Sequence, residues 1–446
     1  MSRPRLVAGA AGILLLVASA ACTGGNAAPT LSATQSSVAP PTPSPQVHDV
    51  ASIVGASDQR LAPPAVTTPL SGAGLIEDRV DVGGSALAVS TTGEILAGQL
   101  GADTYYHRVE RFRIGGTPQP VDASYQRYTE AGYPNGGDGA PSISEDAMAW
   151  LAYLDARDDL NIADFVVYAA DSDGRNIRRI GQSSPDIPDV GTGRNVQVPF
   201  WRERLLLLGG RAYWMESVRL VGDIDRMPNF QVNDPVGVEV MSAPLDGSAP
   251  QRVTFHGWQH GLDLCSLADA PALLYLDSAL SQAPNTGTAS LHRATVDDDG
   301  EVTSDQIVWS AAEDGAYVTA ASACGDTVAV SWVDWQPDPQ TGLSASVLEI
   351  MHDGVTTTVQ DAPMGGYFTD LHVTPHAVFF GGANGTVDGG EYVFDLDTGR
   401  LYRISQVMGY YDSAFVTRSM IAWREEDPQA ADPQHPFKWS AAPLLG

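Results

Sequence analysis

The sequence predicts an all-β protein whose small sheets repeat around a ring. From about residue 69 onward no convincing amphipathic helix appears, and short runs of β-forming residues alternate with Gly, Asp and Asn. Apolar and aromatic runs recur along this part of the chain, and most are followed by a hairpin turn that contains glycine. These turns are spaced by 45 to 73 residues, a period that indicates the blades of a β-propeller.

The recurring apolar runs are expected to be the second strands of the sheets. They are 148–153, 211–214, 272–276, 328–332, 377–380 and 420–423. The hairpin turns lie at Gly115, Asp173, Asp246, Asp299, Asp353 and Thr398, each followed by glycine. A predicted loop insertion at 221–234 explains the longest spacing between them.

The ends of the chain are expected to share the last sheet. Residues 413–425 and 437–445 supply two or three strands after the sixth turn, and a strand near 79–82 could complete that sheet. We therefore predict a single propeller over residues 69–446, with seven blades of four antiparallel strands, six or eight blades being the alternatives. Closure of the ring would remove the exposed sheet edges that template aggregation.

Residues 1–21 have the pattern of a signal peptide. Arg3 and Arg5 precede an apolar run, 6–21, that is too short to span a bilayer comfortably, and small residues lead to Cys22. The arrangement resembles a bacterial lipoprotein signal. This resemblance implies a mature chain that starts at Cys22, with diacylglycerol on the thiol and an acyl chain such as palmitate on the amine. An ordinary secreted protein with an incidental cysteine is the alternative.

Residues 22–68 are dominated by Ala, Pro, Ser, Thr and Gln. Such a segment cannot bury enough apolar surface to offset its chain entropy, and its prolines keep it extended. We expect a disordered tether that spaces the propeller from a membrane. Together with the signal, it predicts a lipid-anchored protein of the cell membrane, on the extracytoplasmic face.

Composition and motifs exclude several classes of function. The net charge of −29 makes nucleic acid a poor partner, since phosphate binding needs a basic surface. No Gly-x-Ser-x-Gly, His-Glu-x-x-His or phosphate-binding glycine loop is present. The acidic run 297–301 lacks the spaced ligands of a calcium loop and is expected to be a turn. We predict no cofactor, no metal site and no catalytic residue of a known motif.

Cys265 and Cys324 are an even pair in a chain expected to be exported. Each lies just before an apolar run, so equivalent strands of neighbouring blades could hold them side by side. A disulfide and two buried reduced thiols are equally compatible with the sequence.

The blade pattern of a strand, an Asp-Gly turn and a strand with basic residues recurs at 173–180 and 246–254. It resembles the blades of TolB-like and related WD40-like periplasmic propellers. The resemblance implies a ring with a central channel and a face used chiefly for protein contacts at the cell envelope. Because the shared motifs describe how a blade is built, they carry no catalytic residue.

Acidic residues follow the predicted second strands, so aligned blades would gather them on one face of the ring. The candidate residues of this face are Asp155, Glu216, Asp277, Asp334, Trp335 and Glu426. Their carboxylates could bind a cation, a basic peptide or a sugar, and the aromatic ring offers a stacking surface. Solvated loop acids without a ligand are the alternative reading.

These observations together predict a monomeric binding or scaffold module for a protein or glycan of the cell envelope. The alternative is an extracytoplasmic hydrolase or lyase that cleaves a glycan with paired carboxylates on the same face. That alternative depends on analogy with other propellers, a fold that hosts many chemistries.

Overall fold

The computed structural model describes residues 47–48, 58–100, 106–122, 141–156, 163–182, 205–219, 236–248, 250–252, 259–265, 272–278, 286–297, 299–314, 316–334, 346–360, 367–383, 389–406, 414–427, 429 and 437–445. All of them belong to one compact unit, Pro45–Gly446. Their strands form seven sheets, each with four antiparallel strands and two of them with an added parallel strand, and the described part of the chain has a single short 3-10 turn, Leu70–Ala73. No helix in these ranges is long and apolar enough to cross a membrane.

The first four blades follow the chain in order. Blade 1 contains β4 (Ser85–Val89), β5 (Glu94–Leu100), β6 (Tyr106–Arg113) and β7 (Gln119–Pro120). Blade 2 contains β8 (Ser142–Ile143), β9 (Ala147–Ala156), β10 (Ala163–Asp171) and β11 (Arg178–Gln182). Blade 3 contains β12 (Leu206–Leu208), β13 (Arg211–Arg219), β14 (Val236–Pro244) and β15 (Gln251–Arg252). Blade 4 contains β16 (Gln259–Cys265), β17 (Ala272–Ser278), β18 (Thr286–Val296) and β19 (Val302–Asp314).

The last three blades complete the ring. Blade 5 contains β20 (Ala316–Cys324), β21 (Thr327–Asp334), β22 (Ser346–His352) and β23 (Val355–Gln360). Blade 6 contains β24 (Tyr367–Val373), β25 (Ala377–Ala383), β26 (Gly390–Asp395) and β27 (Arg400–Ser405). Blade 7 contains β28 (Ala414–Val416), β29 (Met420–Glu426), β30 (Phe437–Pro443) and β3 (Val80–Asp81).

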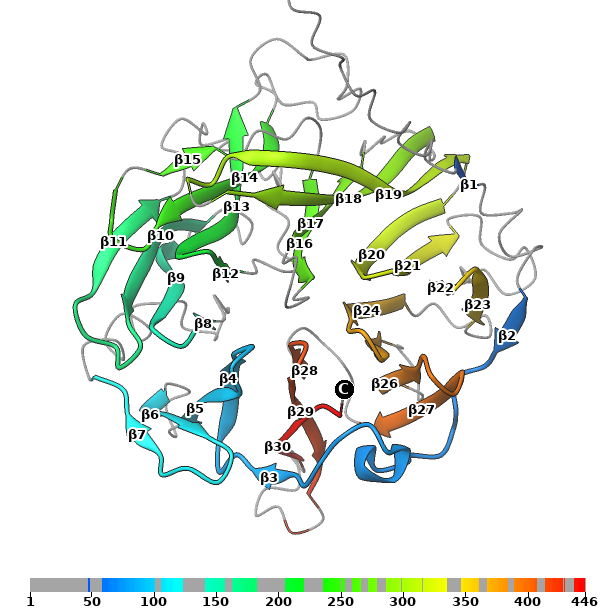
Figure 1. The fold of residues 1–446 in the computed structure, drawn as a ribbon, viewed down its shortest axis with the longest axis horizontal. Helices are drawn as coiled ribbons and strands as arrows, with labels where there is room; N and C mark the ends of the chain where they lie inside the picture. Colours follow the sequence, from blue (N-terminus) through cyan, green and yellow to red (C-terminus); the bar gives the residue numbers. More distant parts are fainter. Residues whose placement is uncertain are drawn as a thin grey trace, which may run out of the picture. The chain divides into compact units, whose positions relative to one another are not determined.

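The seven blades surround a common axis, with the first strand of each blade nearest the centre (Figure 1). All six apolar runs singled out in the sequence are second strands, and all six glycine turns join a third strand to a fourth. The prediction of a seven-bladed propeller is therefore confirmed. The predicted insertion at 221–234 lies outside the described residues.

Strands from both ends of the chain close the ring, as predicted. β3 pairs antiparallel with β30, with Val80 opposite Ala441 and Asp81 opposite Ser440. Arg79, just before β3, forms an ion pair with Glu425 of β29. The last blade is thus held to the N-terminal part of the chain by both backbone and side-chain contacts.

Residues 58–82, here called the N-terminal strap, lie along the outer edges of blades 5, 6 and 7 (Figure 1). β2 (Gln59–Leu61) adds a parallel fifth strand to β23, and Asp58 Oδ2 accepts a hydrogen bond from Thr356 N at 2.9 Å. Thr68 N donates to Arg403 O of β27 at 2.7 Å. Another short strand, β1 (Val47–His48), pairs parallel with β19 of blade 4.

These contacts differ from the predicted tether, which was expected to extend to residue 68. The outer strands of blades offer unpaired backbone groups, and a nearby extended segment can satisfy them. Residues 47–48, 58–61 and 67–68 are used in this way. Residues 1–46 and 49–57, which include the predicted signal and Cys22, lie outside the described residues.

The core lies between neighbouring blades rather than in one central cluster. Each contact between two blades, here called a seam, contains large buried aromatic rings, such as Trp150 between blades 1 and 2, Trp214 between blades 2 and 3, and Trp423 between blades 6 and 7. Gly181 of β11 leaves space for one of these rings, because a Cβ there would lie 2.5 Å from Trp214 Cζ2. Truncating a buried tryptophan costs about 3–5 kcal/mol, so the seams supply much of the stability.

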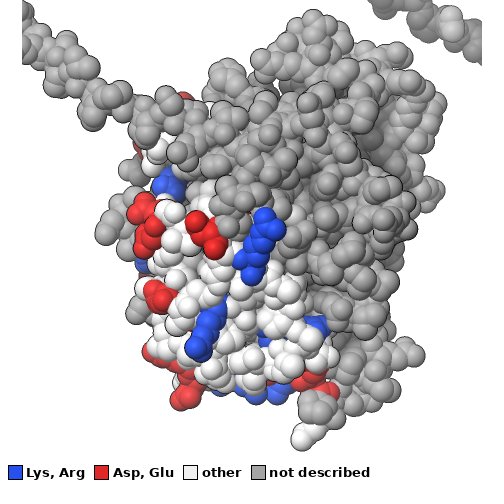
Figure 2. Space-filling model, turned by 90° about the vertical axis from the view of Figure 1, so that its right-hand side faces the viewer, with Lys and Arg blue, Asp and Glu red and all other residues white. Residues whose placement is uncertain are grey.

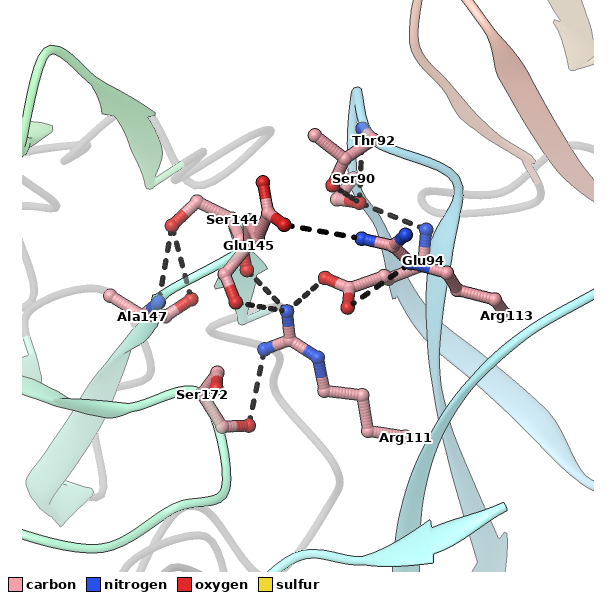
Figure 3. A network of polar contacts seen from close by, with 9 residues as sticks. All are labelled: Ser90, Thr92, Glu94, Arg111, Arg113, Ser144, Glu145, Ala147 and Ser172. Atoms are coloured by element: carbon pink, nitrogen blue, oxygen red, sulfur yellow. Dashed lines mark hydrogen bonds and ion pairs between the residues drawn. The ribbon is translucent and has the colours of Figure 1, made fainter. Parts of the chain in front are cut away.

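Buried arginines add polar contacts to the seams. Arg111 of β6 pairs with Glu94 of β5 and reaches the turns of blade 2, where it donates to the carbonyl oxygens of Ser144, Glu145 (3.1 Å) and Ser172 (3.1 Å) (Figure 3). Its side chain is 9% exposed. A planar guanidinium with five donors can satisfy several turn carbonyls at once, which an aliphatic side chain cannot.

Candidate binding face

The antiparallel order of the strands separates the propeller into two faces. Second strands all run in the same direction, so their C-terminal ends reach the same face, here called the loop face. The connections from first to second strands and from third to fourth strands reach the opposite turn face. Most connections on the loop face, such as 157–162, 220–235 and 335–345, lie outside the described residues.

Four predicted site residues lie near the loop-face ends of second strands in consecutive blades. Asp155 is in β9, Glu216 in β13, Asp277 in β17 and Asp334 in β21, which belong to blades 2, 3, 4 and 5. The four positions therefore form an arc along the loop face. Trp335 lies outside the described residues, directly after Asp334.

Glu426, the fifth acidic residue of the prediction, is at the end of β29 in blade 7. Its Oε1 accepts a hydrogen bond from the backbone nitrogen of Gln406, which follows the last strand of blade 6. This contact joins two blades and gives Glu426 a structural role.

Three of these acids lie at equivalent positions in the blades, a pattern that the sequence analysis did not use. An acid stands two residues after a buried aromatic residue in Trp214–Glu216, Tyr275–Asp277 and Trp332–Asp334. Alignment of the second strands on their aromatic residues would have found this pattern. Asp155 lies further along its strand, five residues after Trp150.

The same alignment selects Glu425 rather than Glu426 in blade 7, since Glu425 is two residues after Trp423. Glu425 is 13% exposed and pairs with Arg79, while Lys438 Nζ lies 3.8 Å from its Oε1. Ser440 Oγ donates to the same oxygen at 2.7 Å. In blade 7 the equivalent acid is thus neutralised by the strands that close the ring.

Two of the arc positions face another acidic residue in the β-ladder. Asp155 of β9 is the register partner of Asp164 in β10, and Glu216 of β13 is the partner of Glu239 in β14. The backbone register therefore places acidic residues opposite one another at two points near the loop-face ends of blades 2 and 3.

On the side of the molecule drawn in Figure 2, acidic and basic side chains are interspersed among the described residues. The four arc positions belong to the second strands of four consecutive blades.

The acidic segment 297–301 forms the turn between β18 and β19, as its sequence predicts. Asp297 Oδ1 accepts hydrogen bonds from the backbone nitrogens of Asp299 at 3.1 Å and Glu301 at 2.9 Å. Across the described parts of the chain, no group of three or more His, Cys, Asp or Glu side chains could hold a metal ion.

Cys324 is disulfide-bonded. It ends β20, the innermost strand of blade 5, while Cys265 ends β16, the innermost strand of blade 4. The pairing of these two cysteines remains a prediction, because the side chain of Cys265 is not described. Their places at equivalent strand ends of adjacent blades agree with the pairing.

Comparisons with known proteins give no family. No protein-family model matches the chain, and no curated protein is similar to it in sequence. Among solved structures, a Mycobacterium tuberculosis puromycin-hydrolyzing peptidase is 13% identical with a TM-score of 0.42, covering 81% of this chain and 53% of its own. The chain thus spans about half the length of that peptidase.

Two other solved structures show similarity of the same low order. A Pyrococcus horikoshii acylaminoacyl peptidase is 10% identical with a TM-score of 0.38, over 64% of this chain and 42% of its own. The α-L-arabinofuranosidase Arb93A from Fusarium graminearum is 12% identical with a TM-score of 0.36, over 68% of this chain and 91% of its own. Their activities are properties of those proteins and are not transferred to this chain.

Proposed function

We propose that this chain is a cell-envelope lipoprotein whose propeller is a binding or scaffold module for a protein or glycan partner outside the cytoplasmic membrane. The observation that carries the binding role is the arc of Asp155, Glu216, Asp277 and Asp334 on the loop face of consecutive blades. The predicted resemblance to TolB-like propellers supports the same role, since that family makes protein contacts at the envelope.

The chemistry of the arc favours a partner that presents basic groups or hydroxyls. Carboxylates accept charge-assisted hydrogen bonds from Arg and Lys side chains and from sugar hydroxyls. The register that places Asp155 opposite Asp164 and Glu216 opposite Glu239 adds two further acidic positions near the same ends of blades 2 and 3. Such binding weakens as salt concentration rises.

A pull-down from native envelope tests this role. The bait is the full lipid-anchored chain, compared with a variant that carries Asp155→Asn, Glu216→Gln, Asp277→Asn and Asp334→Asn. A matched control removes the same charge from exposed turns, with Asp173→Asn, Asp299→Asn, Glu301→Gln and Asp353→Asn. Loss of the partner in the arc variant alone supports the proposal. If both variants retain the partner equally, the arc is not part of the binding site. If both variants lose it equally, binding depends on the net charge of the chain and not on the arc.

Membrane attachment is tested at Cys22. Metabolic labelling with palmitate should mark the wild-type chain and leave Cys22→Ala unlabelled, and the variant should leave the detergent phase on phase separation. A chain that is labelled without Cys22 would contradict the proposed attachment site.

A glycan hydrolase or lyase is the second candidate, and the opposed pairs Asp155–Asp164 and Glu216–Glu239 are the observation that favours it. Cleavage of a glycosidic bond by acid and base catalysis needs two neighbouring carboxyl groups. Release of reducing ends or unsaturated products from envelope polysaccharides, abolished by Asp155→Asn or Glu216→Gln, would establish this candidate. Glycan capture without turnover would favour the binding module.

A further inference from the structure

The seam between blades 4 and 5 contains an unusual set of buried groups. Trp309 of β19 and Trp332 of β21 pack across it, with ring centroids 5.2 Å apart. Near the turn face, Arg293 of β18 donates from Nη2 to Gly325 O of blade 5 at 2.7 Å. The next residue back from Gly325 is the disulfide-bonded Cys324. A hydrogen bond thus joins blades 4 and 5 at the turn-face end of this seam.

Glu349 lies in the middle of the same seam. Val347 is the register partner of Trp332, and Glu349 is two residues further along β22, opposite Val330. Because side chains alternate along a strand, Glu349 lies on the sheet face that carries Trp332 and packs on blade 4. Glu349 is 1% exposed, and its Oε2 has no hydrogen-bond partner among the described residues.

Thr358 of β23 is the register partner of Glu349 on the other side. It is 0% exposed, and its Oγ1 also lacks a hydrogen-bond partner within the described part of the chain. Directly opposite residues of an antiparallel pair lie on the same face, so the hydroxyl and the carboxyl group are neighbours. The structure has no hydrogen bond between these two atoms, and one bond, formed after rotation of either side chain, would satisfy both groups.

Among the described residues, no cation contributes to the pKa of Glu349, whose shift has burial as its one cause. The acidic and basic residues on its own strand and on β2, β18, β19 and β21 are His352, Arg60, His292, Arg293, Asp305, Glu313, Asp314 and Asp334. His352 Nδ1 is hydrogen-bonded to Thr327 Oγ1 at 2.7 Å, and Arg293 is bonded to Gly325 O. Burial alone raises the pKa of Glu349, from the ordinary 4.5 to about 7.

We propose that Glu349 is a proton-controlled latch of the seam between blades 4 and 5, closed when the carboxyl group is protonated and loosened when it is ionised. The neutral group has an O–H that can donate to Thr358 Oγ1. The ionised group has acceptors only, and it places an uncompensated charge in an apolar seam. Loosening releases the proton of Glu349 to solvent, and no bond other than this O–H breaks.

The direction of the pH effect follows from the two states. The exposed carboxyl group of an opened seam ionises near 4.5, whereas the buried group holds its proton up to about 7. The closed seam therefore loses stability as the pH rises from 4.5 to about 7, and the loss is complete above 7. A pKa difference of this size corresponds to a roughly 300-fold increase of the opening equilibrium constant.

Amide hydrogen exchange of the full chain between pH 5 and 8 tests the latch, after correction for the intrinsic exchange rate. Between pH 5 and pH 8, opening of β21, β22 and β23 should rise by roughly 70-fold in the wild type, because part of the titration lies below pH 5. Glu349→Gln, a neutral side chain of nearly the same shape, should remain at the wild-type pH 5 level throughout. Glu301→Gln, in an exposed turn, should follow the wild type. A pH-dependent rise that persists in Glu349→Gln would overturn the proposal, as would a wild type without such a rise.

A second variant isolates the hydrogen bond to Thr358. Thr358→Val keeps the shape of the side chain and removes the hydroxyl group. It should raise opening at pH 5 by about fivefold, the effect of one hydrogen bond, and leave opening at pH 8 unchanged. An unchanged value at both pH values would remove Thr358 from the latch, and an equal rise at both would show a packing defect instead.

Discussion

Replacement of Arg111 by methionine tests whether polar contacts between blades hold the ring together. Methionine keeps the length and the apolar stem of the side chain and removes the guanidinium group. The substitution eliminates the ion pair with Glu94 and the hydrogen bonds to the carbonyl oxygens of Ser144, Glu145 and Ser172 of the next blade (Figure 3).

The expected cost follows from what remains after the substitution. Removal of one partner of a buried ion pair costs about 3–5 kcal/mol, because the other charge stays buried. Glu94 is 14% exposed and keeps a second cation, since Arg113 Nε lies 3.6 Å from its Oε1. We therefore expect a loss near the lower limit, about 3 kcal/mol of the free energy of unfolding.

Arg108→Met is the matched control, because Arg108 lies on the same strand and forms an ion pair with Glu110 of that strand. The Arg108 side chain is 61% exposed, and a surface pair contributes about 0–1 kcal/mol. Urea unfolding of the two variants and the wild type, followed by circular dichroism, measures the difference. An equal effect of both substitutions would refute the argument that burial makes the Arg111 contacts strong.

A double-mutant cycle separates the ion pair from the carbonyl contacts. Glu94→Gln combined with Arg111→Met should lower the free energy of unfolding by less than the sum of the two single changes, because the double variant no longer buries the Glu94 carboxylate without its partner. Strict additivity would show that Glu94 and Arg111 do not depend on one another.

Two further predictions concern other seams. Cys324→Ser should lower the free energy of unfolding by about 2–5 kcal/mol, and Cys265→Ser should have the same effect. The double variant should lose no more than either single variant. Thermal unfolding with and without reductant measures these effects, and additive losses would disprove the pairing. Gly300→Ala should cost about 1–3 kcal/mol more than Gly354→Ala in urea unfolding, since both positions have positive φ (83° and 76°) but only at Gly300 would a Cβ meet Arg211. Equal costs would show that the Arg211 side chain moves aside freely.

The features predicted correctly from the sequence depend on local patterns. A glycine after Asp or Thr marks a tight turn wherever the chain must reverse, and an apolar run such as 420–423 marks a buried strand. Each of these two signals lies within a few residues of the sequence, so it can be recognised without knowing which blades are neighbours. The prediction of β3 in the last blade used the incomplete count of strands at the C-terminus.

The N-terminal strap could not be predicted in this way. Gln59–Leu61 has no alternating apolar pattern, and its partner β23 lies almost 300 residues further along the chain. Such a strand forms because an edge is available, and the edge exists only after blade 5 has folded.

Glu349 shows a second limit of pattern reading. A charged residue inside a strand usually marks a solvent-facing side of a sheet. Both sides of a propeller blade are covered by neighbouring blades, so the alternation of apolar and polar residues does not distinguish a buried side from an exposed one. The offset between Glu425 and Glu426 has a similar origin, because only alignment on Trp423 shows which acid is equivalent to those of the other blades.

The N-terminal strap also determines how the molecule would respond to mechanical force. Tension applied through an anchored N-terminus would first reach β1, which pairs with β19 of blade 4, then Asp58 and β2 on the rim of blade 5, and then the contacts at Thr68 and Arg79. Successive attachments of this kind share a load among four blades, and the last of them is the strand that closes the ring. Under tension the N-terminal strap would detach from the outer edges of the blades before the pairing of β3 with β30 broke. The N-terminal segment could then extend while the propeller stayed folded.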